Sequence, residues 1–122
     1  MGVRIGAEGC PVEMNLEYPA FDLLKVAIAR HIGALGNESL MMIYRDELPD
    51  TYAETLDRLV TRKEIHPATK QFLLSPSCGG FLMPSGCRAL MDDMTGLEDN
   101  AGSGLRTILD YCVKSRMRMV WR

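Results

Sequence analysis

The two ends of the chain alternate between apolar and polar residues. Residues 2–7, GVRIGA, place an apolar side chain at every second position, and residues 116–121, RMRMVW, repeat the pattern. A period of two predicts a strand with one buried face. Because a lone strand leaves its backbone groups unpaired, we expect the two segments to pair within one small sheet, with Trp121 buried. The arginines on the other side of both strands would then face water.

Four stretches between these ends repeat their apolar residues at helical spacing. The stripes are Phe21, Leu24, Ile28, Ile32 and Leu35; Tyr52, Leu56, Leu59 and Val60; Cys87, Leu90, Met91 and Met94; and Leu105, Ile108, Leu109 and Cys112. Residues 8–19 and 67–74 show no such stripe, so we expect a loop and a short connecting segment there. Residues 81–83 are expected to form a short strand. Residues 37–48 fit either a helix or a strand, and a helix is favoured.

Polar residues at the starts of these stripes predict helix caps. In the sequence TYAE, Thr51 and Glu54 have the spacing of a capping box. In this motif each of the two side chains accepts a hydrogen bond from the backbone N–H of the other residue. Ser85 and Ser103 are the expected N-caps of the last two helices. The residues before Ser103, from 96 onward, read GLEDNAG and are expected to form a flexible hinge.

These elements predict an α+β fold, with four or five helices packed on one face of a small sheet that includes the N- and C-terminal strands. A chain of 122 residues has the length of one domain, so residues 1–122 are expected to form a single globular domain. Hydrophobic residues make up 47% of the chain and charged residues 25%, a balance typical of a folded protein. Folding is therefore expected without a metal ion or a disulfide.

The charge and the absence of targeting patterns narrow the class of protein. The formal net charge is −2, which offers no basic field for phosphates and makes nucleic-acid binding unlikely. Lys25 interrupts the apolar residues 23–29, so neither a signal peptide nor a membrane span is expected. The sequence SPSCGG lacks the lysine and the glycine spacing of a phosphate-binding loop. We expect a cytoplasmic protein with no cofactor and no membrane partner.

Candidate chemistry is concentrated in residues 75–87, SPSCGGFLMPSGC. Cys78 lies in a turn, where a thiol becomes reactive if a helix N-terminus or a nearby base lowers its pKa. His66 is a base that could approach it, and Ser75 and Ser77 flank it in the sequence. These four residues form the candidate reactive or ligand site, although a turn cysteine and an ordinary histidine are the simpler interpretation. No residue is assigned a catalytic role.

The remaining thiols indicate structure rather than chemistry. Cys87 and Cys112 lie on helical stripes, where a buried unpaired thiol behaves as a small hydrophobic side chain. The C-x8-C spacing of Cys78 and Cys87 is wider than that of common structural zinc sites, so no metal is expected. In a reducing compartment all four cysteines stay free.

Two groups of charged residues stand out along the chain. Asp92 and Asp93 are neighbours on a helix and point about 100° apart, so they are expected to belong to a solvated face. Arg116, Arg118 and Arg122 lie at the C-terminal strand and form the candidate interaction surface, which suits an acidic partner. An exposed sheet face is the simpler interpretation of the three arginines.

A Met-Gly start, Tyr18 and Phe21 at the beginning of a helix, and the turn SCGG followed by CRALMDDM occur together in this chain. In these features it resembles a loosely defined group of small uncharacterised proteins from bacteria and their phages. The resemblance implies a phage or mobile-element origin, and it implies no activity, because none is established for that group. Members with acidic residues around the turn cysteine resemble a cation-binding loop, whereas Ser77 and Gly79 occupy those positions here.

The residues favour a non-enzymatic protein-interaction module, because stripes, caps and turns account for nearly all the distinctive positions. The partner is an unknown protein, and a homodimer is also open. The alternative is a small thiol- or metal-dependent protein with its site around Cys78. A rapidly labelled Cys78 or a stoichiometric metal ion would favour this alternative.

Overall fold

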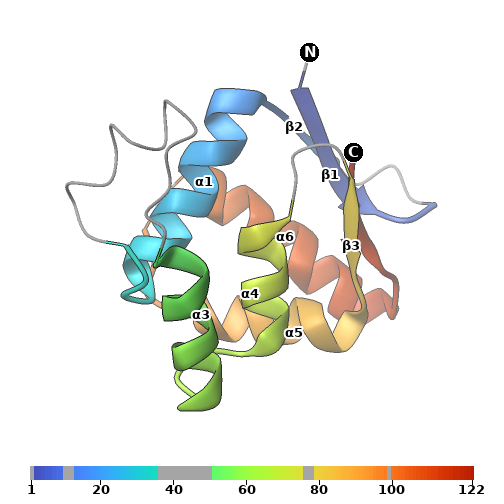
Figure 1. Ribbon diagram of the computed structural model, residues 1–122. Coiled ribbons are helices and arrows are strands. Elements are labelled where there is room, and N and C mark those ends of the chain that lie inside the picture. The colour runs from blue at the N-terminus through green and yellow to red at the C-terminus, as the bar shows by residue number, and fades with distance from the viewer. Residues whose placement is uncertain (1, 10–12, 36–50, 76–78, 99) are drawn as a thin grey trace.

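The computed structural model describes residues 2–9, 13–35, 51–75, 79–98 and 100–122 (Figure 1). Within them the fold is α+β, as the sequence predicts, with five helices and a four-stranded antiparallel sheet. The strands are β1 (Gly2–Ala7), β2 (Glu13–Glu17), β3 (Gly80–Leu82) and β4 (Met119–Trp121). The helices are α1 (Tyr18–His31), α3 (Tyr52–Thr61), α4 (Pro67–Leu74), α5 (Pro84–Asp93) and α6 (Asn100–Ser115). The segment 37–48, for which a helix was favoured, lies outside the described residues.

The first and last strands pair with each other at the centre of the sheet, whose order is β2-β1-β4-β3. Ile5 lies opposite Trp121, and Arg4 exchanges two backbone hydrogen bonds with Arg122, with N···O distances of 2.8 and 3.0 Å. The predicted pairing of the two ends is therefore confirmed. The C-terminal strand is shorter than expected, because Arg116 adopts a left-handed conformation at φ 57° where α6 ends, and strand pairing begins at Met119.

The prediction of a loop over residues 8–19 was wrong for its second half, because β2 forms there and pairs with the edge of β1 that β4 leaves unpaired. Met14 and Leu16 are half-buried and alternate with exposed Glu13, Asn15 and Glu17. An edge strand needs only one partly buried face, so two apolar residues are enough to anchor it. The period of two was present in the sequence but short.

The helices pack on one face of the sheet, as Figure 1 shows with α6 alongside β1 and β4. The four predicted stripes fall on α1, α3, α5 and α6, and most of their residues are buried, although Ile32, Leu35 and Met94 follow the last residue of their helix. None of the described helices is long and apolar enough to cross a membrane.

A fifth helix, α4, forms where only a connecting segment was expected, so that prediction was wrong. Pro67 occupies its first turn, where a proline costs no hydrogen bond. Thr69, Phe72 and Leu73 are buried at i, i+3 and i+4, a stripe of little more than one turn. A stripe this short, with a polar threonine in it, does not stand out in the sequence.

The predicted cap residues do not cap their helices. Thr51 is the N-cap of α3, but its side chain forms no capping hydrogen bond. Helix α5 begins at Pro84 with Met83 as its N-cap, so Ser85 lies inside the first turn. Helix α6 begins at Asn100, and Ser103 therefore lies within it rather than at its start. In α5 the proline at the first helical position marks the start of the helix one residue before Ser85, so the serine is not the cap.

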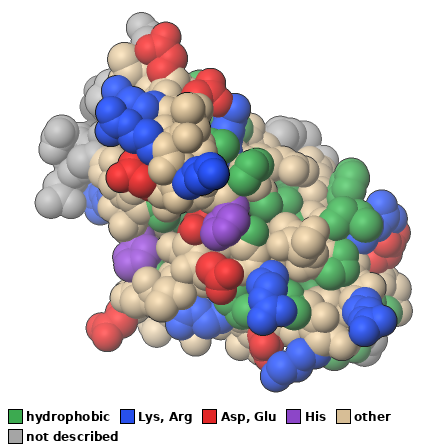
Figure 2. Space-filling model, turned by 90° about the horizontal axis from the view of Figure 1, so that it is seen from below, with side chains coloured by type: hydrophobic (Ala, Val, Ile, Leu, Met, Phe, Trp, Pro, Cys, Tyr) green, Lys and Arg blue, Asp and Glu red, His purple; other side chains and the backbone are tan. Residues whose placement is uncertain are grey.

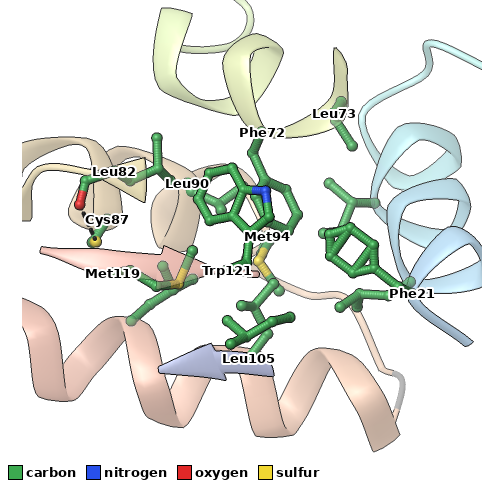
Figure 3. Packing of buried hydrophobic residues seen from close by; sticks show 14 of the residues in the cluster. Phe21, Phe72, Leu73, Leu82, Cys87, Leu90, Met94, Leu105, Met119 and Trp121 are labelled. Atoms are coloured by element: carbon green, nitrogen blue, oxygen red, sulfur yellow. Dashed lines mark hydrogen bonds between the residues drawn. The ribbon is translucent and has the colours of Figure 1, made fainter. Parts of the chain in front are cut away.

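The core is built around Trp121, which is 1% exposed. Figure 3 shows its indole ring beside Phe72, and the two rings meet edge to face with centroids 5.2 Å apart. Phe72 in turn meets Phe21 edge to face at 5.9 Å. Gly80 lies opposite Trp121 on β3, where a Cβ atom would come within 2.3 Å of the indole. A glycine at this position therefore makes room for the tryptophan.

We predict that Trp121→Ala lowers the free energy of unfolding by about 3–5 kcal/mol, because it leaves a cavity between three strands and α4. The measurement is urea denaturation of the full chain. Arg122→Ala is the control, because Arg122 is exposed and its loss should change stability by no more than about 0.5 kcal/mol. Equal losses in both variants, or solvent-like tryptophan emission from the native protein, would contradict the buried position of Trp121.

Candidate functional site

The structure does not bring together the described members of the predicted thiol site. His66 and Ser75 are the N-cap and C-cap of α4, so they lie at opposite ends of a helix about 12 Å long. Cys78 and Ser77 lie outside the described residues. The site around Cys78 therefore gains no support from the positions of His66 and Ser75, and it stays a prediction.

His66 is engaged by a carboxylate that the sequence analysis assigned to solvent. Asp93 accepts hydrogen bonds from the backbone N–H of His66 at 2.8 Å and from the hydroxyl of Thr69 at 2.5 Å. Its other oxygen lies 3.0 Å from Nδ1 of His66. The Asp93 side chain is 8% exposed, so the expectation of a solvated position was wrong for Asp93, whereas Asp92 is exposed as predicted. The Asp93 carboxylate lies 24 residues along the chain from Thr69 and 27 from His66.

This cluster is a helix cap contributed by another helix. The N-terminus of α4 has backbone N–H groups without partners inside the helix, and a negative charge there also matches the helix dipole. Asp93, at the end of α5, supplies both the acceptor and the charge. The hydrogen bonds join α4 to α5, so the cluster accounts for His66 as a structural residue.

Ser75 also has a structural role at the other end of α4. Its hydroxyl donates to the carbonyl of Phe72 at 2.6 Å, and its own carbonyl accepts a hydrogen bond from Lys25 Nζ at 2.9 Å. The Lys25 ammonium lies 4.8 Å from the ring centroid of Phe21. Burial lowers the pKa of Lys25, and the nearby charge of Asp22 partly opposes the shift. These contacts fix α1 against the C-terminal end of α4.

Cys87 and Cys112 are buried and neither forms a disulfide, as predicted. The Cys87 thiol donates to the carbonyl of Leu82 at 3.7 Å, drawn as a dashed line in Figure 3. Burial raises the pKa of Cys87, which keeps the thiol protonated and unreactive at neutral pH. Among the described residues, no group of three or more histidine, cysteine or acidic side chains could hold a metal ion.

The three arginines of the predicted interaction surface occupy different surroundings. Arg116 ends α6 and is exposed. Arg118 forms a two-pronged ion pair with Glu8, with N···O distances of 2.6 and 2.5 Å, and lies 5.1 Å from the ring centroid of Phe81. These hydrogen bonds lower the pKa of Glu8. Arg122 lies instead beside Arg4, which the sequence analysis had placed facing water but not in the site.

Arg4 and Arg122 line a hollow of about 460 Å³ on the face of the sheet that the helices leave open. Side chains alternate across a sheet, so Gly6 and Val120 belong to the same face, as does Phe81 opposite Val120. Phe81 is 45% exposed and Met83, two residues further on, is 52% exposed. We use the name open sheet face for this surface, made up of Arg4, Gly6, Phe81, Met83, Val120 and Arg122.

Sequence reasoning missed Arg4 and Phe81 as members of this surface. The signal for Arg4 was available, because pairing the two terminal strands places residues of both strands side by side on the outer face. The signal for Phe81 was absent, because an aromatic residue in a short strand is more often buried.

Charges elsewhere on the surface are mixed. Seen from below, the molecule shows Lys and Arg side chains interspersed with Asp and Glu, so this side presents no continuous basic surface (Figure 2). The described ion pairs are consistent with this view: Lys70 pairs with Asp57, and Lys114 pairs with Asp110.

Comparison of the chain with protein-family models, with curated proteins and with solved structures gave no match. The likeness to small bacterial and phage proteins therefore stays a prediction, and the candidate site is argued from this chain alone.

We predict that Cys87 and Cys112 resist alkylation in the native protein and react fully after denaturation. Mass spectrometry of peptides from the treated protein locates each modified thiol. Replacing Cys87 by Ser should cost about 1–3 kcal/mol of stability, because burying a hydroxyl costs more than burying a thiol and the Leu82 carbonyl lies 3.7 Å from the sulfur, too far for a good O–H···O hydrogen bond. Alkylation of either thiol at the rate of a free cysteine would show that the two stripes do not face the core.

We predict that Asp93→Ala destabilises the protein by about 1–3 kcal/mol, because the buried Thr69 hydroxyl and the His66 N–H lose their acceptor. Asp92→Ala is the matched control: it removes the same side chain from the preceding, exposed position, and its effect should stay within about 0.5 kcal/mol. Urea denaturation measures both. If the two variants are equally stable, Asp93 does not cap α4.

Proposed function

We propose that this protein is a non-enzymatic protein-interaction module that docks an extended segment of another protein on its open sheet face. The observation that carries the proposal is the combination found there: exposed Phe81 and Met83 lie on the same face as Arg4 and Arg122, which have no carboxylate partner among the described residues. Exposed apolar side chains beside unneutralised cations suit a partner with apolar and acidic side chains.

The energetics of such a contact favour Phe81 as its centre. Aromatic and arginine residues contribute most of the binding energy in protein interfaces when a partner excludes water from them. Phe81 is next to Arg118, whose charge Glu8 already neutralises, so covering the ring leaves no unpaired cation buried. The free cations, Arg4 and Arg122, lie further along the same face and are available to the partner's carboxylates.

The same charges disfavour a second copy of this chain as the occupant of the open sheet face. A two-fold dimer through this face would bring the same patch of both chains together. With the two-fold axis at this pair, Arg4 and Arg122 would meet the same two cations of the other copy, and like charges at an interface cost affinity. The homodimer left open by the sequence is therefore not the occupant proposed for this face.

The thiol or metal alternative rests on Cys78 and gains no support from the described residues. His66 is held by Asp93, and Ser75 is held by Lys25 and Phe72. An origin in a phage or mobile element rests on the resemblance alone and stays a prediction.

Selection from a displayed library of random peptides tests the proposal. We expect enriched peptides that combine acidic residues with at least one large apolar residue, and we expect them to shift the backbone amide resonances of Phe81, Met83 and Val120. Phe81→Ser should weaken their binding by about tenfold or more, since an aromatic anchor typically contributes at least 2 kcal/mol.

Leu23→Ser is the matched control, because Leu23 is also an exposed apolar residue, at 36%, but lies on α1. It should leave the affinity of the selected peptides unchanged. Selected peptides that shift resonances of the helices instead, or that bind Phe81→Ser as tightly as the native protein, would overturn the proposal.

A further inference from the structure

The open sheet face contains two arginines held side by side by the backbone. Arg4 and Arg122 donate to each other's carbonyl oxygens, at 2.8 and 3.0 Å, which makes them a directly opposed pair on two antiparallel strands. Their side chains therefore leave the sheet on the same face, with Cβ atoms about 5.5 Å apart. Both line the hollow of about 460 Å³.

This arrangement is unfavourable in the protein alone. A guanidinium keeps its charge at every physiological pH, and like charges directly opposite each other destabilise a sheet. None of the ion pairs within the described residues includes Arg4 or Arg122. Arg118 differs from these two arginines, because it donates two hydrogen bonds to the carboxylate of Glu8.

The carboxylates around the hollow do not neutralise the pair. Glu8 lines the hollow but is already engaged by Arg118. Glu13 lines it from β2, opposite Gly6, and forms no described ion pair with either arginine. The charged side chains that line the hollow are thus two arginines without a described ion pair and two carboxylates, one of which Arg118 engages.

The hollow has room for a ligand group between the arginines. Gly6 lies between Arg4 and Glu8 along the outer face of β1 and fills none of the space above it. The volume of about 460 Å³ is within the range of about 300–1,000 Å³ that ligand sites occupy. Two guanidinium groups that line such a space offer planar sets of N–H donors, which match the oxygens of a phosphate or a carboxylate.

We propose that Arg4 and Arg122 together bind one oxyanion group, a phosphate or a carboxylate, in this hollow. The inference rests on the proposed function for the source of the group, which is a side chain of the docked segment. Binding removes the repulsion between the two arginines, so the sheet is more stable with the oxyanion than without it.

Inorganic phosphate and glutarate are the probes, with sodium chloride at matched ionic strength as the reference for salt effects. Isothermal titration gives the dissociation constant, and thermal unfolding gives the shift in melting temperature. We expect saturable binding of at least one probe and a rise in melting temperature with its concentration. The probe that binds more tightly assigns the group as phosphate or carboxylate.

Arg4→Gln and Arg122→Gln should each weaken this binding by about tenfold or more, since a hydrogen bond to a charged group contributes about 1.5–3 kcal/mol. Without any probe, both variants should melt at the temperature of the native protein or above it, because the repulsion is gone. Arg58→Gln, on the exposed surface of α3, is the matched control and should change neither the affinity nor the melting temperature.

No saturable binding of either probe, or unchanged binding in the double variant, would overturn the oxyanion site. A loss of binding in Arg58→Gln equal to that in Arg4→Gln would also overturn it, by showing a general charge effect. Phe81→Ser separates this inference from the docking proposal, because it should weaken peptide binding by about tenfold or more and leave phosphate or glutarate binding intact. Peptide docking without oxyanion binding would contradict only the oxyanion site. Oxyanion binding without peptide docking would contradict only the proposed function.

Discussion

The pairing of β1 with β4 is the interaction on which the rest of the structure depends. It joins residues at the two ends of the chain, with Ile5 opposite Trp121 and Arg4 opposite Arg122. On the inner face it places the indole ring against Phe72, in contact with the helices that cover the sheet (Figure 3). On the outer face the same register places two arginines side by side. One pairing therefore completes the core and creates the candidate site.

This double role separates the residues for folding from those for binding. Because side chains alternate along a strand, neighbours such as Trp121 and Arg122 serve opposite faces. Substitutions on the inner face remove buried contacts and lower stability, whereas substitutions on the outer face leave the core intact. The repulsion between Arg4 and Arg122 has a small electrostatic cost, and the stability supplied by the core offsets it.

The sequence predicted the parts of this fold that have a long, regular apolar period. The stripes of α1, α5 and α6 and the terminal strands were found from spacing alone, and Cys87 and Cys112 were correctly assigned to the core. Helix α4 and strand β2 were missed because each buries only two or three side chains, too few for a periodic signal. Asp93 was misplaced because its partners, His66 and Thr69, come from another helix, and no local pattern records such a contact. Arg122 was found as a candidate, but its partner Arg4 depends on the register between the chain ends.

The most direct test of this account is the nuclear Overhauser effect between the α-protons of Ile5 and Trp121 in the native protein. Arg4 and Arg122 form the hydrogen-bonded pair of the ladder, so the next pair, Ile5 and Trp121, is the non-hydrogen-bonded pair in which the backbones approach most closely. The account predicts a strong effect between these two protons, together with slow exchange of the Arg122 amide proton. Absence of the effect, with an Arg122 amide that exchanges as fast as an unstructured one, would contradict the pairing and with it both the core and the candidate site.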